Sequence, residues 1–182
     1  MSERDLRRRC RRLLNDLDIR PPLDVEELCQ RFAQQQGKPI RLLPYDIPVP
    51  GPFGLWIGTD DADFIVYQRQ TSRAHQRHII LHEFGHRFAQ HQSCSPPGLA
   101  SVLGRGAEAA VRHGELPLLP ESAIRCALGR SAYDDEQERE AETVATIILE
   151  WASVLDHVVP KARDDGAAER MGKALSDRLG WL

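Results

Sequence analysis

The sequence lacks any apolar run near the roughly 20 residues that a membrane-spanning helix needs. Basic residues at its N-terminus are not followed by the apolar stretch of a secretory signal, so we expect a cytoplasmic protein without membrane association. Internal repeats and low-complexity tracts are absent too. A length of 182 residues then predicts a single domain spanning residues 1–182, long enough to bury one core.

Cysteine pairs of the C-x-x-C type are also missing. The four cysteines are scattered along the chain: Cys10, Cys29, Cys94 and Cys126. This scatter favours free thiols over a disulfide framework or a cysteine-ligated zinc site.

An excess of positive charge is missing as well, because the formal net charge is −3. This balance disfavours binding of nucleic acid by the whole chain. One local exception is a group of arginines within the first dozen residues: Arg4, Arg7, Arg8, Arg9, Arg11 and Arg12. They could meet phosphates or an acidic partner. Their interleaving with Leu6, Leu13 and Leu14 favours a solvated helix face, so direct nucleic-acid binding is not expected.

Hydrophobic periodicity predicts two helices near the N-terminus, over 6–17 and over 24–35. A Pro-Pro pair at 21–22 ends the first helix, and Gly37 ends the second. We interpret residues 1–36 as a helical prelude that packs against the core. A helix-turn-helix is the alternative interpretation.

Three short strands are predicted next, over 40–43, 53–58 and 63–67. A proline-rich loop separates the first strand from the second, and a polar turn at 59–61 joins the second to the third. The pattern predicts a small antiparallel sheet of about three strands. The second strand either lies in the core with Trp56 buried or forms an edge along which a substrate peptide could pair.

Two longer helices are predicted over 73–91 and 134–155, each with an apolar stripe at helical spacing. Thr71 or Ser72 supplies the N-cap of the first, and Asp134 opens the second.

The remaining segments are less regular. Residues 92–131 mix serine, proline and glycine, which predicts a variable loop or a lid. Residues 160–182 predict a charged linker and a C-terminal amphipathic helix. The expected fold class is therefore α+β, mostly helical with a small sheet.

Chemistry is concentrated in residues 82–86, which read His-Glu-Phe-Gly-His. His82 and His86 lie one helical turn apart on the same face, so both imidazoles can reach a single ion. Glu83 projects beside them, where its carboxylate can take a proton from a water that the metal activates. Gly85 leaves room for close approach by another backbone. The spacing predicts a zinc site on this helix with Glu83 as the catalytic base.

A catalytic zinc needs a third protein ligand, which must come from elsewhere in the chain. Glu138 is our first choice, because it shares a helix face with Ala141 and Ala145, and small residues allow tight packing against the helix of His82. Glu140 is the alternative third ligand, since its face is also partly apolar. We expect Glu142 to be solvated.

These two segments together resemble the ImmA/IrrE family of zincin-like metallopeptidases. That family has an H-E-x-G-H helix followed by an E-x-E-A-(N/D)-x-F-A helix, which correspond here to 82–86 and 138–145. The chain departs from the pattern at Glu142, at Val144 and in the gap of 52 residues (138 − 86) between His86 and Glu138. The resemblance implies a zincin-like active-site helix, bound Zn2+ and cleavage of a helix-turn-helix repressor in a stress response or mobile element.

Other polar residues near the motif have weaker signals. His78 lies one turn before His82 and could orient a ligand or touch substrate, but an ordinary helix histidine is favoured. His91 is expected to interact with the helix dipole rather than with metal. Tyr133 could stabilise an oxyanion, although simple packing is favoured.

The function predicted from these residues is that of a zinc-dependent metallopeptidase. The alternative is a non-catalytic regulatory or toxin-like protein that binds a partner protein and keeps a structural or vestigial zinc site. DNA binding through the first two helices is a third and weaker possibility.

Overall fold

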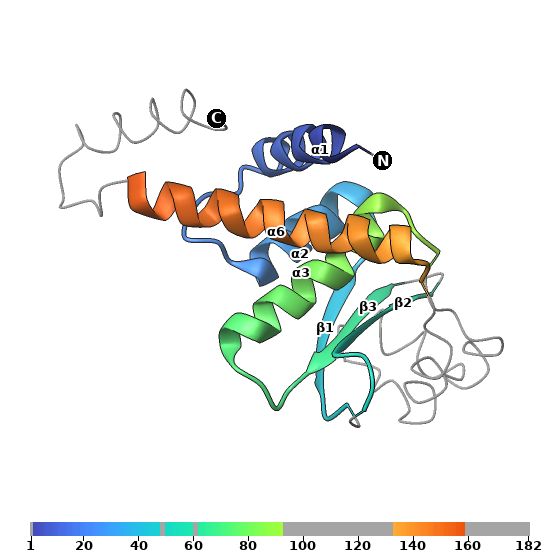
Figure 1. The fold of residues 1–182 in the computed structure, drawn as a ribbon. Coiled ribbons are helices and arrows are strands. Elements are labelled where there is room, and N and C mark those ends of the chain that lie inside the picture. The colour runs from blue at the N-terminus through green and yellow to red at the C-terminus, as the bar shows by residue number, and fades with distance from the viewer. Residues whose placement is uncertain (1, 48–49, 60–61, 93–132, 159–182) are drawn as a thin grey trace.

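The computed structural model describes residues 2–47, 50–59, 62–92 and 133–158. In chain order its elements are α1 (Glu3–Asp16), α2 (Val25–Gln36), β1 (Ile40–Tyr45), β2 (Gly54–Gly58), β3 (Asp63–Gln68), α3 (Arg73–Ala89) and α6 (Asp135–Val158) (Figure 1). The α+β class, with helices around a small sheet, is confirmed. The predicted C-terminal helix and nearly all of the predicted loop or lid at 92–131 lie outside the described residues.

Local capping interactions define the helix ends close to where the sequence predicts them. The Ser72 side chain accepts a hydrogen bond from the backbone N–H of His75 at the start of α3. Asp24 accepts from two backbone N–H groups at the start of α2. Gly37 ends α2 with φ at 69°, in the left-handed region that favours glycine. Each cap satisfies backbone groups that a helix terminus leaves without partners.

The sheet is mixed, so the predicted all-antiparallel arrangement is wrong. Its strand order is β1-β3-β2, with β2 antiparallel to β3 and β1 parallel to β3. The chain reverses once between β1 and β2 and again between β2 and β3, so β1 and β3 run in the same direction. Because β1 pairs with β3 rather than with its sequence neighbour β2, that pairing is parallel. β1 also extends through Pro44, which is tolerated in an outer strand.

Helix α3 lies at the centre of the fold. Figure 1 shows α6 crossing one side of α3, with α1 beyond it, while the sheet lies on the other side of α3. Alternation along β3 divides the core, because Ile65 packs with the cluster formed by the helices. Phe64 and Val66 point to the opposite face and belong to a second cluster with Leu55 and Ile57. The central position of α3 is what brings its polar residues between α6 and the sheet.

The contact between α3 and α6 is unusually close at Gly85. A Cβ atom added there would lie 2.7 Å from the carbonyl oxygen and 2.9 Å from the Cα of Ala141. Ala141 and Ala145 are both fully buried. The predicted close approach of another backbone at Gly85 is thus confirmed, and the small residues of α6 make it possible.

A buried carboxylate ties the C-terminal half of α3 to the sheet. Asp63, only 1% exposed, accepts hydrogen bonds from Lys38 Nζ at 2.8 Å and from Arg87 Nε at 2.6 Å. The Arg87 guanidinium also lies over the rings of Phe32 and Trp56. These contacts fix the orientation of α3 relative to β3.

The described cysteines, Cys10 and Cys29, are free, as predicted, and both are buried. Burial raises the pKa of both thiols to about 12, so they are protonated at neutral pH. Cys94 and Cys126 lie outside the described residues.

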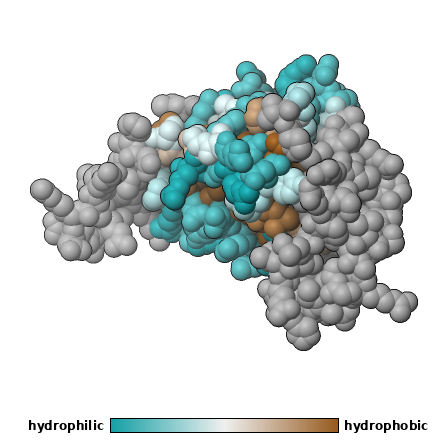
Figure 2. Space-filling model, turned by 90° about the horizontal axis from the view of Figure 1, so that it is seen from below, coloured by the Kyte–Doolittle hydropathy of each residue, from teal (hydrophilic) through white to brown (hydrophobic). Residues whose placement is uncertain are grey.

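The described surface includes both polar and apolar areas. Seen from below the view of Figure 1, it is mostly hydrophilic, with apolar side chains visible between the polar ones (Figure 2). Phe53 and Val154 are large apolar residues with about half of their surface exposed. Among the described helices, none is long and apolar enough to cross a membrane.

Candidate metal centre

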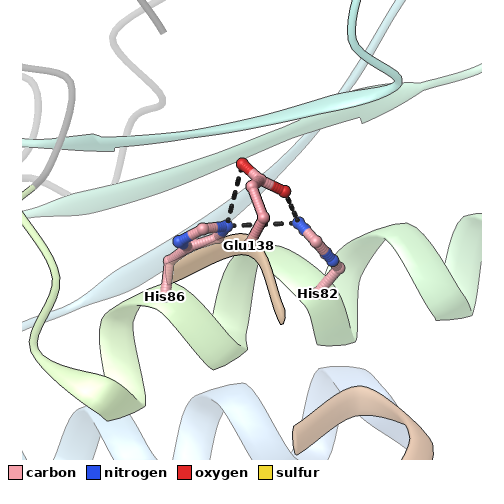
Figure 3. Close-up of side chains that lie close together, drawn as sticks. All are labelled: His82, His86 and Glu138. Atoms are coloured by element: carbon pink, nitrogen blue, oxygen red, sulfur yellow. Dashed lines mark hydrogen bonds and ion pairs between the residues drawn. The ribbon is translucent and has the colours of Figure 1, made fainter. Parts of the chain in front are cut away.

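The side chains of His82, His86 and Glu138 converge on one point between α3 and α6 (Figure 3). The two Nε2 atoms lie 3.1 Å apart. Glu138 Oε2 lies 3.1 Å from His82 Nε2, and Glu138 Oε1 lies 3.7 Å from His86 Nε2. One potential ligand atom from each residue thus falls within 4.8 Å of the others, so the group could hold a metal ion.

These separations fit a small ion with tetrahedral coordination. Ligand atoms at about 2.0–2.2 Å from such an ion lie about 3.4 Å from one another. The three observed distances, 3.1, 3.1 and 3.7 Å, bracket that value. Two imidazole nitrogens and one carboxylate oxygen are also a donor set that suits zinc and related transition metals.

The protonation state of His86 favours a ligand role. Its side chain is fully buried, and burial, together with the nearby His82 and His91, lowers its pKa to about 3. The ring is therefore neutral at pH 7, and a neutral imidazole is the form that binds metals.

Glu138 reaches the group from the first turn of α6. Asp134 caps that helix by accepting hydrogen bonds from the backbone N–H groups of Glu136 and Gln137. Ala141 and Ala145 lie on the same face of α6 as Glu138. Both are small and buried, and the backbone of Ala141 lies against Gly85, so this face packs closely on α3. The Glu138 side chain keeps 48% of its surface exposed, so the group lies at the border between the core and solvent.

Glu83 lies behind the group, on the side of the sheet. It is 5% exposed, and its Oε2 has no hydrogen-bond partner among the described residues. Burial and the negative charge of Glu138 raise the Glu83 pKa to about 8, while a hydrogen bond from the backbone N–H of Trp56 opposes the shift. A carboxyl group with this pKa can both accept and return a proton near neutral pH.

Gly54, the first residue of β2, makes the space for Glu83. A Cβ atom at Gly54 would lie 2.6 Å from Glu83 Oε1 and 2.6 Å from Ile79 Cγ2. A pocket of about 320 Å³ opens beside Gly54 and Glu83, and its lining is partly polar and partly apolar. Its lining residues are Pro52, Phe53, Gly54, Leu55, His75, His78, Ile79, His82, Glu83, Tyr133 and Glu138. Two of the metal-centre residues therefore face a cavity that a small group could enter.

Glu140, the alternative third ligand, is not part of the convergent group. Its Oε2 lies 3.2 Å from Nε2 of His91, and the other ring nitrogen of His91, Nδ1, lies 3.0 Å from His86 Nδ1. His91 is thus a buried neighbour of His86, a role that sequence reasoning missed.

Glu142 is also closer to the centre than expected. Its side chain is half exposed, but Oε2 lies 3.3 Å from His82 Nδ1 and 3.1 Å from His78 Nε2. The i, i+4 spacing places Glu138 and Glu142 on one helix face, and His78 and His82 on another, but which of them meet depends on the register between α3 and α6.

Tyr133 lies just before α6, and its ring stacks on that of His86 with centroids 3.6 Å apart. The ring covers one side of the His86 imidazole, and Tyr133 lines the pocket. Packing, the favoured interpretation, is therefore observed.

Comparison with models of protein families, with curated proteins and with solved structures finds no match for this chain.

Proposed function

We propose that the protein is a zinc-dependent metallopeptidase. The observation that carries this proposal is the meeting of His82, His86 and Glu138 at one point beside the buried carboxyl of Glu83. Three protein ligands with a fourth position left for solvent or substrate are typical of catalytic zinc, whereas structural zinc is usually held by four.

In this proposal α3 and α6 hold the metal, and Glu83, on the side of α3 that faces the sheet, is the base. A bound zinc ion would supply Lewis acidity to a water molecule and to the carbonyl of the scissile peptide bond. The Glu83 carboxylate accepts a proton from that water and then donates it to the leaving amine. Glu83 is therefore a carboxylate again at the end of the cycle. Its burial next to the convergent histidines supports this double role.

The pocket and β2 suggest where a peptide would bind. β2 is at the end of the described strand order, although all five of its residues, including Trp56, are buried, and its first residues, Gly54 and Leu55, line the pocket beside His82 and Glu83. An extended peptide could lie along this strand by β-augmentation and bring a carbonyl to the metal. Phe53 and Ile79 offer apolar contacts for a side chain next to the scissile bond.

The substrate class that we propose is a helix-turn-helix repressor. It rests on the resemblance of 82–86 and 138–145 to the ImmA/IrrE family, as does the proposal that the α3 site is zincin-like. A setting in a stress response or a mobile element follows from the same resemblance.

The decisive experiment is incubation of the zinc-loaded protein with a helix-turn-helix protein encoded beside it, followed by mass analysis of the products. We expect a discrete cleavage that stops when a chelator removes the metal. Glu83→Gln should bind zinc as wild type does but lose at least about 100-fold in cleavage rate, since the general base is removed. Glu136→Gln, on an exposed position of α6, is the matched control and should cleave normally.

Retained cleavage in Glu83→Gln would rule out the mechanism. A stable complex with the repressor that forms without any cleavage would instead favour the alternative, a regulatory binding protein.

A further inference from the structure

Each imidazole of the metal centre has a second polar contact on its other nitrogen. His82 turns Nε2 toward the convergence point and Nδ1 toward Glu142 Oε2, at 3.3 Å. His86 turns Nε2 to the same point and Nδ1 toward His91 Nδ1, at 3.0 Å. His91 in turn lies 3.2 Å from Glu140.

We propose that Glu142 and the His91–Glu140 pair are positioning residues that fix the ring orientation and the tautomer of both histidine ligands. This inference rests on the metal-binding part of the proposed function. It assigns different roles to three glutamates of one helix: Glu138 binds the metal, whereas Glu140 and Glu142 act through histidines.

The chemistry at His82 allows one assignment of protons. Nε2 must keep its lone pair to bind a metal and the Glu142 carboxylate accepts at Nδ1, so the metal-binding form of His82 carries its proton on Nδ1. The lone pair is then on Nε2, which faces Glu138 and His86. The opposite tautomer would place a lone pair against the carboxylate. The Nε2–H of His78 can donate to the same oxygen of Glu142, which holds that carboxylate in place.

The contacts beyond His86 lead to the same assignment for that ring, with the proton on Nδ1. Glu140 accepts, so a neutral His91 carries its proton on Nε2 and offers a lone pair at Nδ1. That lone pair accepts from His86 Nδ1–H, and the lone pair of His86 is left on Nε2. One set of tautomers therefore satisfies both Nδ1 contacts and leaves both Nε2 lone pairs able to bind metal beside Glu138.

Burial distinguishes the series of contacts from His86 through His91 to Glu140 from a surface ion pair. His86 is fully buried, and the side chains of His91 and Glu140 are 7% and 15% exposed. Screening by solvent is weak there, so an acceptor at this position has a strong influence on proton location. Hydrogen-bonded partners of this kind commonly tune the affinity of metal sites.

The test is the zinc affinity of the full-length protein, measured by competition with a chromophoric chelator. Glu142→Ala and Glu140→Ala should each weaken binding by about 10- to 100-fold, the usual effect of losing such a partner. Glu142→Gln keeps an acceptor oxygen and should retain most of the affinity. Glu136→Ala removes the same charge from an exposed position of α6 and should change affinity less than about twofold.

A direct readout is ¹⁵N NMR of the histidine rings. In the zinc-loaded wild type we expect both His82 and His86 to carry their proton on Nδ1 and to bind the metal through Nε2, and ligation through Nδ1 of either ring would overturn the positioning roles. His91→Gln is a second route to the His86 branch if Glu140→Ala fails to fold, and it should also weaken zinc binding.

Unchanged zinc affinity in the Glu142 and Glu140 variants, or an equal loss in Glu136→Ala, would overturn the positioning roles while leaving the peptidase proposal intact. A wild-type protein that binds no zinc would overturn both.

Discussion

At the scale of single residues, Glu83 combines a functional position with an energetic cost. Its carboxyl is buried against β2, and one of its oxygens has no hydrogen-bond partner among the described residues. Burying an ionised group without full compensation is unfavourable, and the group responds by holding its proton up to a pKa of about 8. This arrangement suits proton transfer better than it suits stability.

We therefore expect Glu83→Gln to stabilise the metal-free protein, and more so at alkaline pH. The Glu83 pKa is about 8 when folded and 4.5 in the reference state, so the folded form loses stability as pH rises through this window. Glutamine removes that loss. The variant should gain roughly 2–4 kcal/mol over wild type at pH 8.5 and much less at pH 4.5, by urea unfolding with a chelator present. A gain that does not depend on pH would contradict this explanation.

Residues that act through local spacing could be predicted from the sequence, and those that depend on how helices are offset could not. The i, i+4 histidines and the Glu138 face follow from helix periodicity alone. The contacts of Glu142 with His82 and of His91 with Glu140 depend on the register between α3 and α6, which periodicity does not determine.

At the scale of elements, the packing of α3 on α6 determines whether the centre can assemble. Helix ends were predictable because their caps are local, as at Ser72 and Gly37. The parallel pairing of β1 with β3 was not, because it depends on a partner that is not adjacent in sequence. The position of Glu138 likewise depends on a contact across 52 residues (138 − 86), which the small residues Ala141 and Ala145 on the same helix face indicated.

Gly85→Ala tests this contact. Alanine normally stabilises a helix interior by about 1 kcal/mol relative to glycine. Here its Cβ would approach the Ala141 backbone to 2.7 Å, so α6 must shift away. We expect a loss of about 1–3 kcal/mol in unfolding free energy instead of a gain, together with weaker zinc binding because Glu138 moves. A stabilised variant with normal zinc affinity would show that the helices can separate without disturbing the centre.

At the scale of the whole molecule, metal binding and folding should be linked. A ligand that binds only the folded state stabilises it by about 2.7 kcal/mol at a concentration of 100 times Kd. For a chain of this size that corresponds to a rise in Tm of about 5–10 °C. Scanning calorimetry with and without zinc measures the shift. Glu138→Ala should lose most of it, and an undiminished shift in that variant would place the bound metal elsewhere.

The closeness of Gly85 to Ala141 also affects the order of events during folding. Metal held by an unfolded chain would have to close the loop from residue 86 to residue 138 at its own cost, which is about 3.5 kcal/mol of chain entropy. In the folded protein the packing of α3 against α6 has already closed that loop. The metal would then act as a cross-link added to a finished contact, and a peptide corresponding to α3 alone would offer only two of the three residues of the centre, His82 and His86.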